Sequence, residues 1–270
     1  MMHSHRPLPR LAFRAGAARD GSRELPSEVA VALSYNGSTH AVMMATPADL
    51  EDFARGFTLT EGIASLDEIE SIEPVETPRG IDLQIWLMQA AADRQAKRRR
   101  TMAGPVGCGL CGIDSLEEAV RVPRPVPASD FAMTPEQVME AIAALEAHQP
   151  LHDITRAAHG AAFWAEGGIV LAREDVGRHN ALDKLIGALA GRRPAGQGAL
   201  ILTCRTSVDM VQKACAAGFP LLIAVSAPTA AAVAMAEAAG LTLVALARPD
   251  GFECFTHPQR ITLQEAAHVA

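Results

Sequence analysis

The sequence predicts an α/β protein: an α+β first half, then a second half of parallel strands with helices packed on them. In the second half, apolar runs at 199–204, 220–226 and 241–247 alternate with helical stretches that begin at Thr or Ser and end at Gly. This β-α-β-α-β order is typical of parallel strands joined by helices. In the first half, Asn36-Gly37 separates two β-rich runs, which indicates a hairpin.

The first half begins with an arginine-rich stretch that has no unbroken apolar core, so it is not a secretory signal. We expect residues 1–26 to be a disordered tail. The hairpin follows over 28–46, and Thr46 and Pro47 are placed to cap and begin a helix. Alternating apolar residues over 81–87 predict a half-buried strand. A charged segment, 91–107, then runs into a Gly/Pro loop. Residues 27–127 therefore form an N-terminal domain that ends in this loop and a proline-rich linker.

Residues 128–270 are expected to form the second, α/β domain. Thr134 and Gln137 form a capping box that opens a helix to about Ala147. A hairpin is predicted to turn at Gly167-Gly168, and a helix is predicted over 177–190. The alternation of strands and helices described above completes the domain.

Composition excludes several classes of protein. The formal net charge of −7 argues against general nucleic-acid binding, which normally uses a basic domain. The most apolar region, 220–247, is interrupted by Pro228, Glu237 and Gly240, which indicates strands and a helix rather than a membrane span. Five sparse cysteines do not form a secreted disulfide framework and favour a reducing, cytoplasmic setting.

The stretch "GPVGCGLCGIDSLEEAV" (104–120) places Cys108 and Cys111 among four glycines. A structural zinc site needs four ligands, and the chain has no second Cys-x-x-Cys. A thioredoxin-like pair would follow a strand in a βαβ unit, and here the flanks are glycines and a basic run. Two unreactive thiols in a loop remain an alternative. A helix predicted from Ser115 and the basic run 97–100 both favour the thiolate, which can carry sulfur as a persulfide.

Two further stretches are candidates for binding. "REDVGRHNALDKL" (173–185) gathers polar residues at a helix start, which indicates a lined pocket, although Asp175 as a simple cap is the alternative. "ALARPDGFECFTHPQRI" (245–261) follows the last predicted strand, where α/β sheets collect ligands. There, Arg248 and Arg260 are suited to phosphate and Asp250 to a base or ribose, with an ordinary polar turn as the alternative.

Taken together, these stretches resemble the formate dehydrogenase accessory sulfurtransferases, the FdhD family. The resemblance rests on "ATPADLEDFARGFTLTEGI", "GCGLCG", "EDVGRHNALDKLIG", the run from "MVQKACAAGF" to "ARPDGF", and "THPQRI". It spans about residues 28–261, and the combination of motifs is more specific than any one of them.

The resemblance implies a sulfurtransferase that takes sulfur from a cysteine desulfurase as a persulfide. The sulfur goes to the molybdenum or tungsten of bis-molybdopterin guanine dinucleotide, a bound substrate, before that cofactor enters formate dehydrogenase. Cys108 matches the persulfide carrier and Cys111 its helper. The segment that contacts the guanine dinucleotide matches Leu246, Ala247, Arg248, Pro249, Asp250 and Gly251. The family further implies a cytoplasmic homodimer, no permanent cofactor or metal, and a cytidine-deaminase-like three-layer domain with a mixed sheet.

The chain departs from two of these patterns. Zinc deaminases use H-x-E followed by P-C-x-x-C, whereas Cys108 follows Gly107 here and Val42 stands two residues after His40. Deamination is therefore not expected, whatever the fold. Some family members carry a basic residue where this chain has Gly251.

His179, Asp175 and Arg205 are further pocket candidates by their position in the pattern. The alternative functions are a cofactor-binding chaperone without sulfur chemistry and a thiol–disulfide oxidoreductase.

Overall fold

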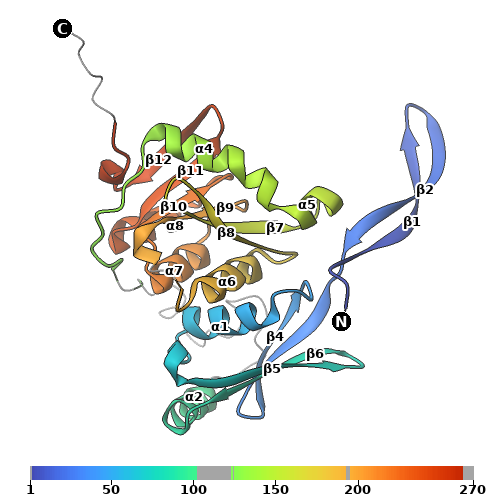
Figure 1. The fold of residues 1–270 in the computed structure, drawn as a ribbon, viewed down its shortest axis with the longest axis vertical. Coiled ribbons are helices and arrows are strands. Elements are labelled where there is room, and N and C mark those ends of the chain that lie inside the picture. Colours follow the sequence, from blue (N-terminus) through green and yellow to red (C-terminus); the bar gives the residue numbers. More distant parts are fainter. Residues whose placement is uncertain (1, 102–122, 124, 193–194, 264–270) are drawn as a thin grey trace.

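The described residues form two sheets, each with its own hydrophobic core, and a long hairpin that stands away from both (Figure 1). The structure is a computed structural model, and it describes residues 2–101, 123, 125–192 and 195–263. The Cys-x-x-Cys stretch, and the helix predicted after it, lie outside the described residues.

The first sheet carries the hairpin that Asn36-Gly37 predicts. β3 (Val29–Tyr35) and β4 (Ser38–Ala45) are antiparallel, and the turn uses positive φ at Asn36 (46°) and Gly37 (77°). β6 (Gly80–Leu87) confirms the predicted alternating strand. β5 (Ile69–Thr77), preceded by a 3-10 turn (Leu66–Glu68), was not predicted, and it completes the strand order β4-β3-β6-β5. The charged segment at 91–101, predicted to run into a loop, belongs to helix α2 (Gln89–Thr101).

The helix expected at Pro47 begins three residues later. α1 (Leu50–Thr60) follows Asp49, which has a left-handed conformation with φ 53°. Thr46 does not cap it. The Thr46 backbone N–H donates to the Asp175 carboxylate at 3.0 Å, and the Thr46 hydroxyl accepts from the Val176 N–H at 3.1 Å. The residue that resembled a cap therefore binds the second half of the chain.

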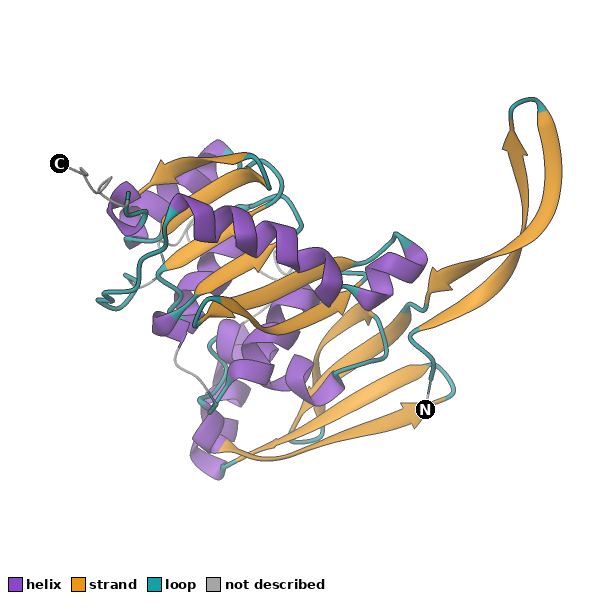
Figure 2. Ribbon diagram, turned by 45° about the horizontal axis from the view of Figure 1, so that its top comes forward, coloured by secondary structure: helices purple, strands orange, loops and turns teal. Residues whose placement is uncertain are grey.

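The second sheet is covered by helices on both faces (Figures 1 and 2). Its strand order is β12-β11-β10-β9-β7-β8, with β9, β10 and β11 parallel as predicted. Apolar residues of α4 pack on one face, and those of α6, α7 and α8 pack on the other. The strands are β7 (His159–Ala165), β8 (Gly168–Asp175), β9 (Ala199–Leu202), β10 (Leu221–Ala224), β11 (Thr242–Arg248) and β12 (Gly251–Thr256). The helices are α4 (Pro135–Leu145), α5 (Pro150–Thr155), α6 (Arg178–Leu189), α7 (Val208–Ala217) and α8 (Ala230–Ala239), with 3-10 turns at Glu146–His148, Ala195–Gln197 and Pro258–Arg260.

Two local sequence signals in the second half, a capping box and a hairpin turn, predict the structure well. Thr134 and Gln137 form the predicted capping box at α4: the Thr134 N–H donates to the Gln137 side chain at 2.9 Å, and the Gln137 N–H donates to the Thr134 hydroxyl at 3.3 Å. β7 and β8 form the predicted hairpin, and its turn uses positive φ at Glu166 and Gly167, one residue earlier than expected. β12 was not predicted, because its residues have no apolar run.

Helices α1 and α6 join the two halves through a glycine-to-glycine crossing. A Cβ added at Gly56 would lie 1.7 Å from the carbonyl oxygen of Asp183, and one added at Gly187 would lie 1.9 Å from the carbonyl oxygen of Asp52. The two backbones therefore touch, and any side chain at either position would force them apart. This contact packs α1 of the first half directly on α6 of the second.

The prediction of a disordered tail over 1–26 is wrong. Residues 5–26 form an antiparallel hairpin, β1 (His5–Arg14) and β2 (Ala17–Pro26), paired along its whole length. Its turn has positive φ at Ala15 (48°) and Gly16 (75°). The prediction gave weight to charge and to the missing apolar run. Strand pairing depends instead on alternation and on the turn, and Ala-Gly is a weaker turn signal than Asn-Gly.

Candidate functional site

The carboxyl ends of four strands lie along the same side of the second sheet. We call this side the carboxyl edge, and it is the candidate site. β9, β10 and β11 are parallel, and β7 is antiparallel to both β8 and β9, so β8 runs in the same direction as β9. Helices α6, α7 and α8 begin just beyond β8, β9 and β10. Helix N-termini carry partial positive charge and free N–H groups, which suits phosphate and other anions.

The predicted nucleotide segment, 246–251, lies on this edge and spans the end of β11, the turn and the first residue of β12. Leu246 has a positive φ of 53° within a bulge of β11, and its N–H donates to the Ser226 carbonyl oxygen at 3.4 Å. The Arg248 guanidinium donates to the carbonyl oxygens of Val225 and Ala247, which fixes it across the ends of β10 and β11. The side chains of Arg248, Pro249 and Asp250 are exposed, whereas Ala247 is buried. A Cβ added at Gly251 would meet no atom within 4 Å.

Arg260, the other arginine predicted to suit phosphate, does not lie beside Arg248. Its guanidinium donates to the Gly240 carbonyl oxygen and to the Thr242 hydroxyl, both at 3.0 Å. Thr242 is the first residue of β11 and Arg248 the last, so the two arginines lie at opposite ends of that strand. Arg260 therefore stabilises the fold at the end of the sheet away from the candidate site.

His179, at the start of α6, lies on the carboxyl edge, and so does the exposed Arg205, which follows β9. The Nε2 of His179 lies 3.5 Å from the Asp209 carboxylate of α7, and the imidazole lowers the pKa of that carboxyl. The hydroxyl of the buried Thr206 makes no hydrogen bond within the described part of the chain, and His179 Nε2 has only its long contact to Asp209. Unpaired buried polar atoms are costly, so this place between the starts of α6 and α7 is suited to a polar ligand. No motif pointed to Thr206.

Asp175 does not line a pocket. Its carboxylate is fully buried and accepts from the N–H groups of Thr46 (3.0 Å) and Gly177 (2.7 Å) and from the Asn180 amide (3.0 Å). The Lys184 ammonium lies 2.6 Å from it and also donates to the Thr46 carbonyl oxygen at 2.9 Å. These contacts saturate the carboxylate, so Asp175 ties the two halves together.

A second buried ion cluster supports the same helix contact. The Lys213 ammonium of α7 donates to the carboxylates of Asp183 (3.0 Å) and Glu61 (2.9 Å) and to the Thr60 hydroxyl (2.8 Å). Burial alone would lower the pKa of Lys213, but the two carboxylates outweigh it and raise the pKa. Lys213 is therefore a permanently charged structural cation, and Asp183 is its counter-ion.

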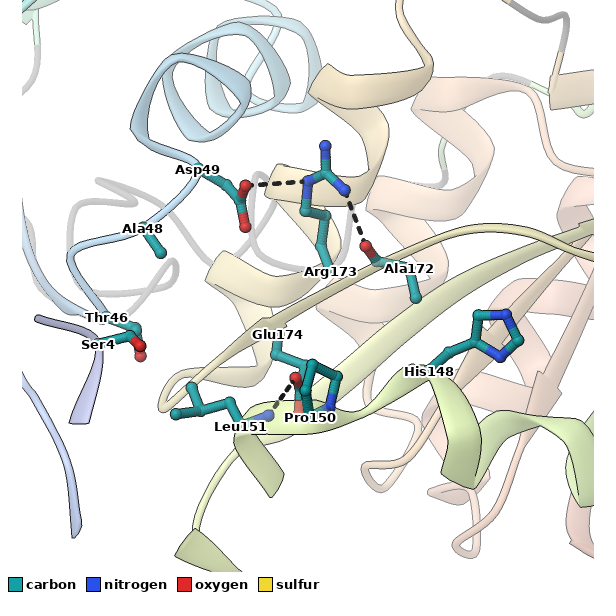
Figure 3. Close-up of a pocket in the computed structure, with 10 residues that line it drawn as sticks. All are labelled: Ser4, Thr46, Ala48, Asp49, His148, Pro150, Leu151, Ala172, Arg173 and Glu174. Carbon is teal, nitrogen blue, oxygen red and sulfur yellow. Dashed lines mark hydrogen bonds and ion pairs between the residues drawn. The ribbon is translucent and has the colours of Figure 1, made fainter. Parts of the chain in front are cut away.

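A cavity of about 200 Å³ lies between the chain before α1, the start of α5 and β8 (Figure 3). Its charged groups already have partners. The Glu174 carboxylate accepts from the N–H groups of Leu151 (2.8 Å) and His152 (2.7 Å), which caps α5. Arg173 lies 3.5 Å from Asp49 and donates to Asp52 at 2.8 Å. We therefore interpret this cavity as a packing gap between elements and not as a binding site.

Two of the three described cysteines, Cys204 and Cys215, are buried and are poor nucleophiles, whereas Cys254 is exposed. Burial raises the pKa of Cys204 to about 11 and that of Cys215 to about 12, so both are protonated at neutral pH. The pKa of Cys254, on β12, is also raised by burial. Cys108 and Cys111 lie outside the described residues, as do the side chains of Arg98, Arg99 and Arg100. Cys204 and Cys215 are therefore poorly suited to nucleophilic sulfur chemistry.

Two classes of site find no support in the described part of the chain. No group of His, Cys, Asp or Glu side chains there is arranged to hold a metal ion. None of the described helices has both the length and the hydropathy needed to cross a bilayer.

Comparisons with known proteins agree on one family. The model of the FdhD/NarQ family matches residues 26–262. The sulfur carrier protein FdhD of Agrobacterium fabrum is 52% identical over 263 residues, which cover 96% of this chain and 97% of that protein. The protein of the same name from Brucella abortus is 51% identical over 259 residues, covering 95% and 96%. A crystal structure described as a formate dehydrogenase accessory protein from Desulfotalea psychrophila aligns with a TM-score of 0.75 and 27% identity, covering 96% of this chain and all of that one. The chain belongs to the FdhD/NarQ family.

Proposed function

We propose that this protein is a sulfur carrier that serves formate dehydrogenase. It takes sulfur from a cysteine desulfurase onto Cys108 and passes it to bis-molybdopterin guanine dinucleotide before that substrate enters the enzyme. The relatives named as sulfur carriers support the role over nearly the whole chain. The cysteine chemistry supports its location, because burial holds Cys204 and Cys215 protonated, whereas the Cys108–Cys111 pair is flanked by glycines.

Sulfur uptake on this proposal is thiol exchange. The Cys108 thiolate attacks the terminal sulfur of the desulfurase persulfide, a new S–S bond forms, and the desulfurase cysteine leaves as its thiolate. Cys111 then attacks the Cys108 sulfur and expels hydrosulfide towards the metal of the bound substrate. The two cysteine thiolates supply the electrons and close as a disulfide, which a cellular dithiol must reduce before the next cycle.

The carboxyl edge of the second sheet is the proposed binding site for the guanine dinucleotide. Arg248 is fixed by two carbonyl contacts and exposed, which preorganises it for phosphate, and Asp250 is exposed beside it. The rest of the segment, from Leu246 to Gly251, offers backbone groups. We further propose a cytoplasmic protein, a homodimer, and a second domain related in architecture to cytidine deaminases.

The nucleotide site is tested by titrating GDP into the protein in a calorimeter. Arg248→Ala should weaken binding about tenfold, because it removes a charge-assisted hydrogen bond. Arg260→Ala is the matched control and should leave affinity unchanged, because that side chain lies at the other end of β11. Gly251→Lys should tighten GDP binding. A side chain at this position meets no other atom, and the lysine adds a cation. Equal losses in the two arginine variants would place the nucleotide elsewhere.

Sulfur transfer is tested by restoring formate dehydrogenase activity in cells that lack their own copy of this protein. Cys108→Ala should abolish the activity, although GDP binding is retained. A cofactor-binding chaperone would behave differently, because it would still activate the enzyme without the cysteine.

A further inference from the structure

Three chain segments meet at one end of the carboxyl edge, where β7 begins and β8 and β9 finish. His159 is the first residue of β7 and lies directly opposite Asp175, the last residue of β8. On the other side of β7, the N–H of Thr203, just beyond β9, donates to the Gly160 carbonyl oxygen at 3.1 Å. The segments that leave β8 and β9 therefore flank the start of β7.

Each of the two flanking segments carries an arginine. Arg178 is the first residue of α6, just after β8, and Arg205 lies in the segment between β9 and α7. Arg178 is half-buried and Arg205 is exposed. Neither guanidinium makes a hydrogen bond or a salt bridge with another described residue. We call His159, Arg178 and Arg205 the basic cluster.

The charges of the basic cluster act on the same small region. Burial lowers the pKa of His159, and the positive charge of Arg178 lowers it further. Burial raises the pKa of Cys204, just beyond β9, whereas the charges of Arg178 and Arg205 oppose that rise. Both arginines therefore lie within electrostatic range of one buried side chain, and their positive potential overlaps at the ends of β7 and β9.

The carboxylates of this region do not neutralise the basic cluster. Asp175 is paired with Lys184 at 2.6 Å. Asp209 lies 3.5 Å from His179 and accepts from the Ser207 hydroxyl at 3.3 Å. The Arg178 charge contributes to the lowered pKa of Asp209, but no salt bridge joins the two side chains. Two guanidinium charges thus remain without a carboxylate partner among the described residues.

The other polar groups beside the basic cluster are also donors that lack an acceptor. The helices α6 and α7 begin here, and neither cap residue, Gly177 or Ser207, caps its helix with a side chain. Helix N-termini attract anions through their free N–H groups and partial positive charge. The fully buried Thr206 hydroxyl, between Arg205 and the cap of α7, has no hydrogen-bond partner among the described residues. Guanidinium, N–H and hydroxyl groups together require an acceptor, which an anionic ligand supplies.

The basic cluster is separate from the nucleotide segment, 246–251. In the strand order, β9 is two strands and β7 three strands away from β11. At the usual spacing of neighbouring strands, about 4.8 Å, the cluster lies roughly 10–15 Å from the end of β11. We propose that His159, Arg178 and Arg205 form a second phosphate subsite, which binds a diphosphate group of the guanine-nucleotide substrate.

This inference rests on the proposed function, because its ligand is the substrate named there. That substrate carries two guanine nucleotides, so the diphosphate has two possible sources. It belongs either to the nucleotide whose other end lies at 246–251 or to the second nucleotide of the same molecule.

The test is calorimetric titration of the full chain with inorganic pyrophosphate and, separately, with GDP. Arg178→Ala with Arg205→Ala should weaken pyrophosphate binding roughly a hundredfold, because two charge-assisted hydrogen bonds are lost. Lysine at both positions keeps the charge and should recover part of the affinity. The matched control, Arg19→Ala with Arg79→Ala, removes the same charge from exposed positions on the hairpin and the first sheet and should leave the affinity unchanged. The thermal melt of the Arg178–Arg205 variant should match the wild type, because neither side chain has a described partner.

The GDP titration distinguishes the two sources of the diphosphate. One GDP per chain, weakened both by the Arg178–Arg205 change and by Arg248→Ala, identifies a single nucleotide that spans both places. Two GDP per chain, of which the Arg178–Arg205 change removes one, identify the second nucleotide. The subsite is overturned if the wild type binds no pyrophosphate, or if the Arg178–Arg205 change lowers its affinity no more than the control does. In that case GDP binding that depends on Arg248 would leave the proposed function standing, whereas no GDP binding at all would count against the proposed nucleotide site itself.

Discussion

Lys184→Met tests the tie between the two halves of the molecule. The Lys184 ammonium is fully buried, lies 2.6 Å from the Asp175 carboxylate, and also donates to the Thr46 carbonyl oxygen. Methionine keeps much of the side-chain volume and removes the charge. Asp175 would keep its three N–H donors and lose its cation, leaving a buried uncompensated charge. Breaking a buried pair in this way costs about 3–5 kcal/mol. That is a large share of the ~5–15 kcal/mol that stabilises a typical protein.

The assay is urea unfolding followed by circular dichroism, with a thermal melt beside it. A loss of this size should lower the Tm by about 6–20 °C. Lys97→Met is the matched control, because Lys97 is exposed, and it should change stability by less than about 0.5 kcal/mol. Asp175→Asn combined with Lys184→Met should cost less than the sum of the single changes, by about 1–3 kcal/mol. A Lys184→Met loss below about 1 kcal/mol would refute the idea that this pair holds the halves together.

Three further outcomes follow from the same structure. Gly56→Ala should cost about 3 kcal/mol or more, because its Cβ would lie 1.7 Å from the Asp183 carbonyl oxygen, whereas Gly21→Ala meets nothing and should be neutral in urea unfolding. Iodoacetamide at neutral pH should label Cys108 and Cys111 first and spare Cys204 and Cys215 until the protein unfolds, as read by peptide mass spectrometry; early labelling of the buried pair would contradict their raised pKa values. Burial lowers the pKa of His159, so its contribution to stability is present above the unfolded value of about 6.5 and is lost as pH falls through the folded value. His159→Gln should therefore flatten the loss of stability between about pH 7 and pH 5, and an unchanged slope would show that His159 does not cause it.

Sequence reasoning succeeded where the signal is local. Asn36-Gly37 and the Thr134–Gln137 capping box each fix one geometry through short-range hydrogen bonds and backbone conformation, and both appear as predicted. The alternation of strands and helices after residue 199 gives the parallel sheet, and with it the edge on which Leu246 to Gly251 lie.

Sequence reasoning failed where a residue bonds to a partner that is far away in the chain. Thr46 looks like a helix cap and instead bonds Asp175 and Val176, about 130 positions away. Asp175 looks like a pocket residue, but its buried carboxylate is paired with Lys184 and bonded to neighbouring N–H groups. Arg260 is close to Arg248 in sequence and lies at the other end of β11. The hairpin was missed because its strands carry charge on one face and prolines on the other, so no apolar run marks them.

The most direct measurement of the sulfur-carrier role is intact mass after incubation with a cysteine desulfurase, its pyridoxal phosphate and free cysteine. The wild type should gain the mass of one sulfur atom, and dithiothreitol should remove it. Cys108→Ala should gain nothing, whereas Cys254→Ala, which changes a described thiol on β12, should behave as the wild type. No reducible gain in the wild type, or a gain that persists in Cys108→Ala, would contradict the account.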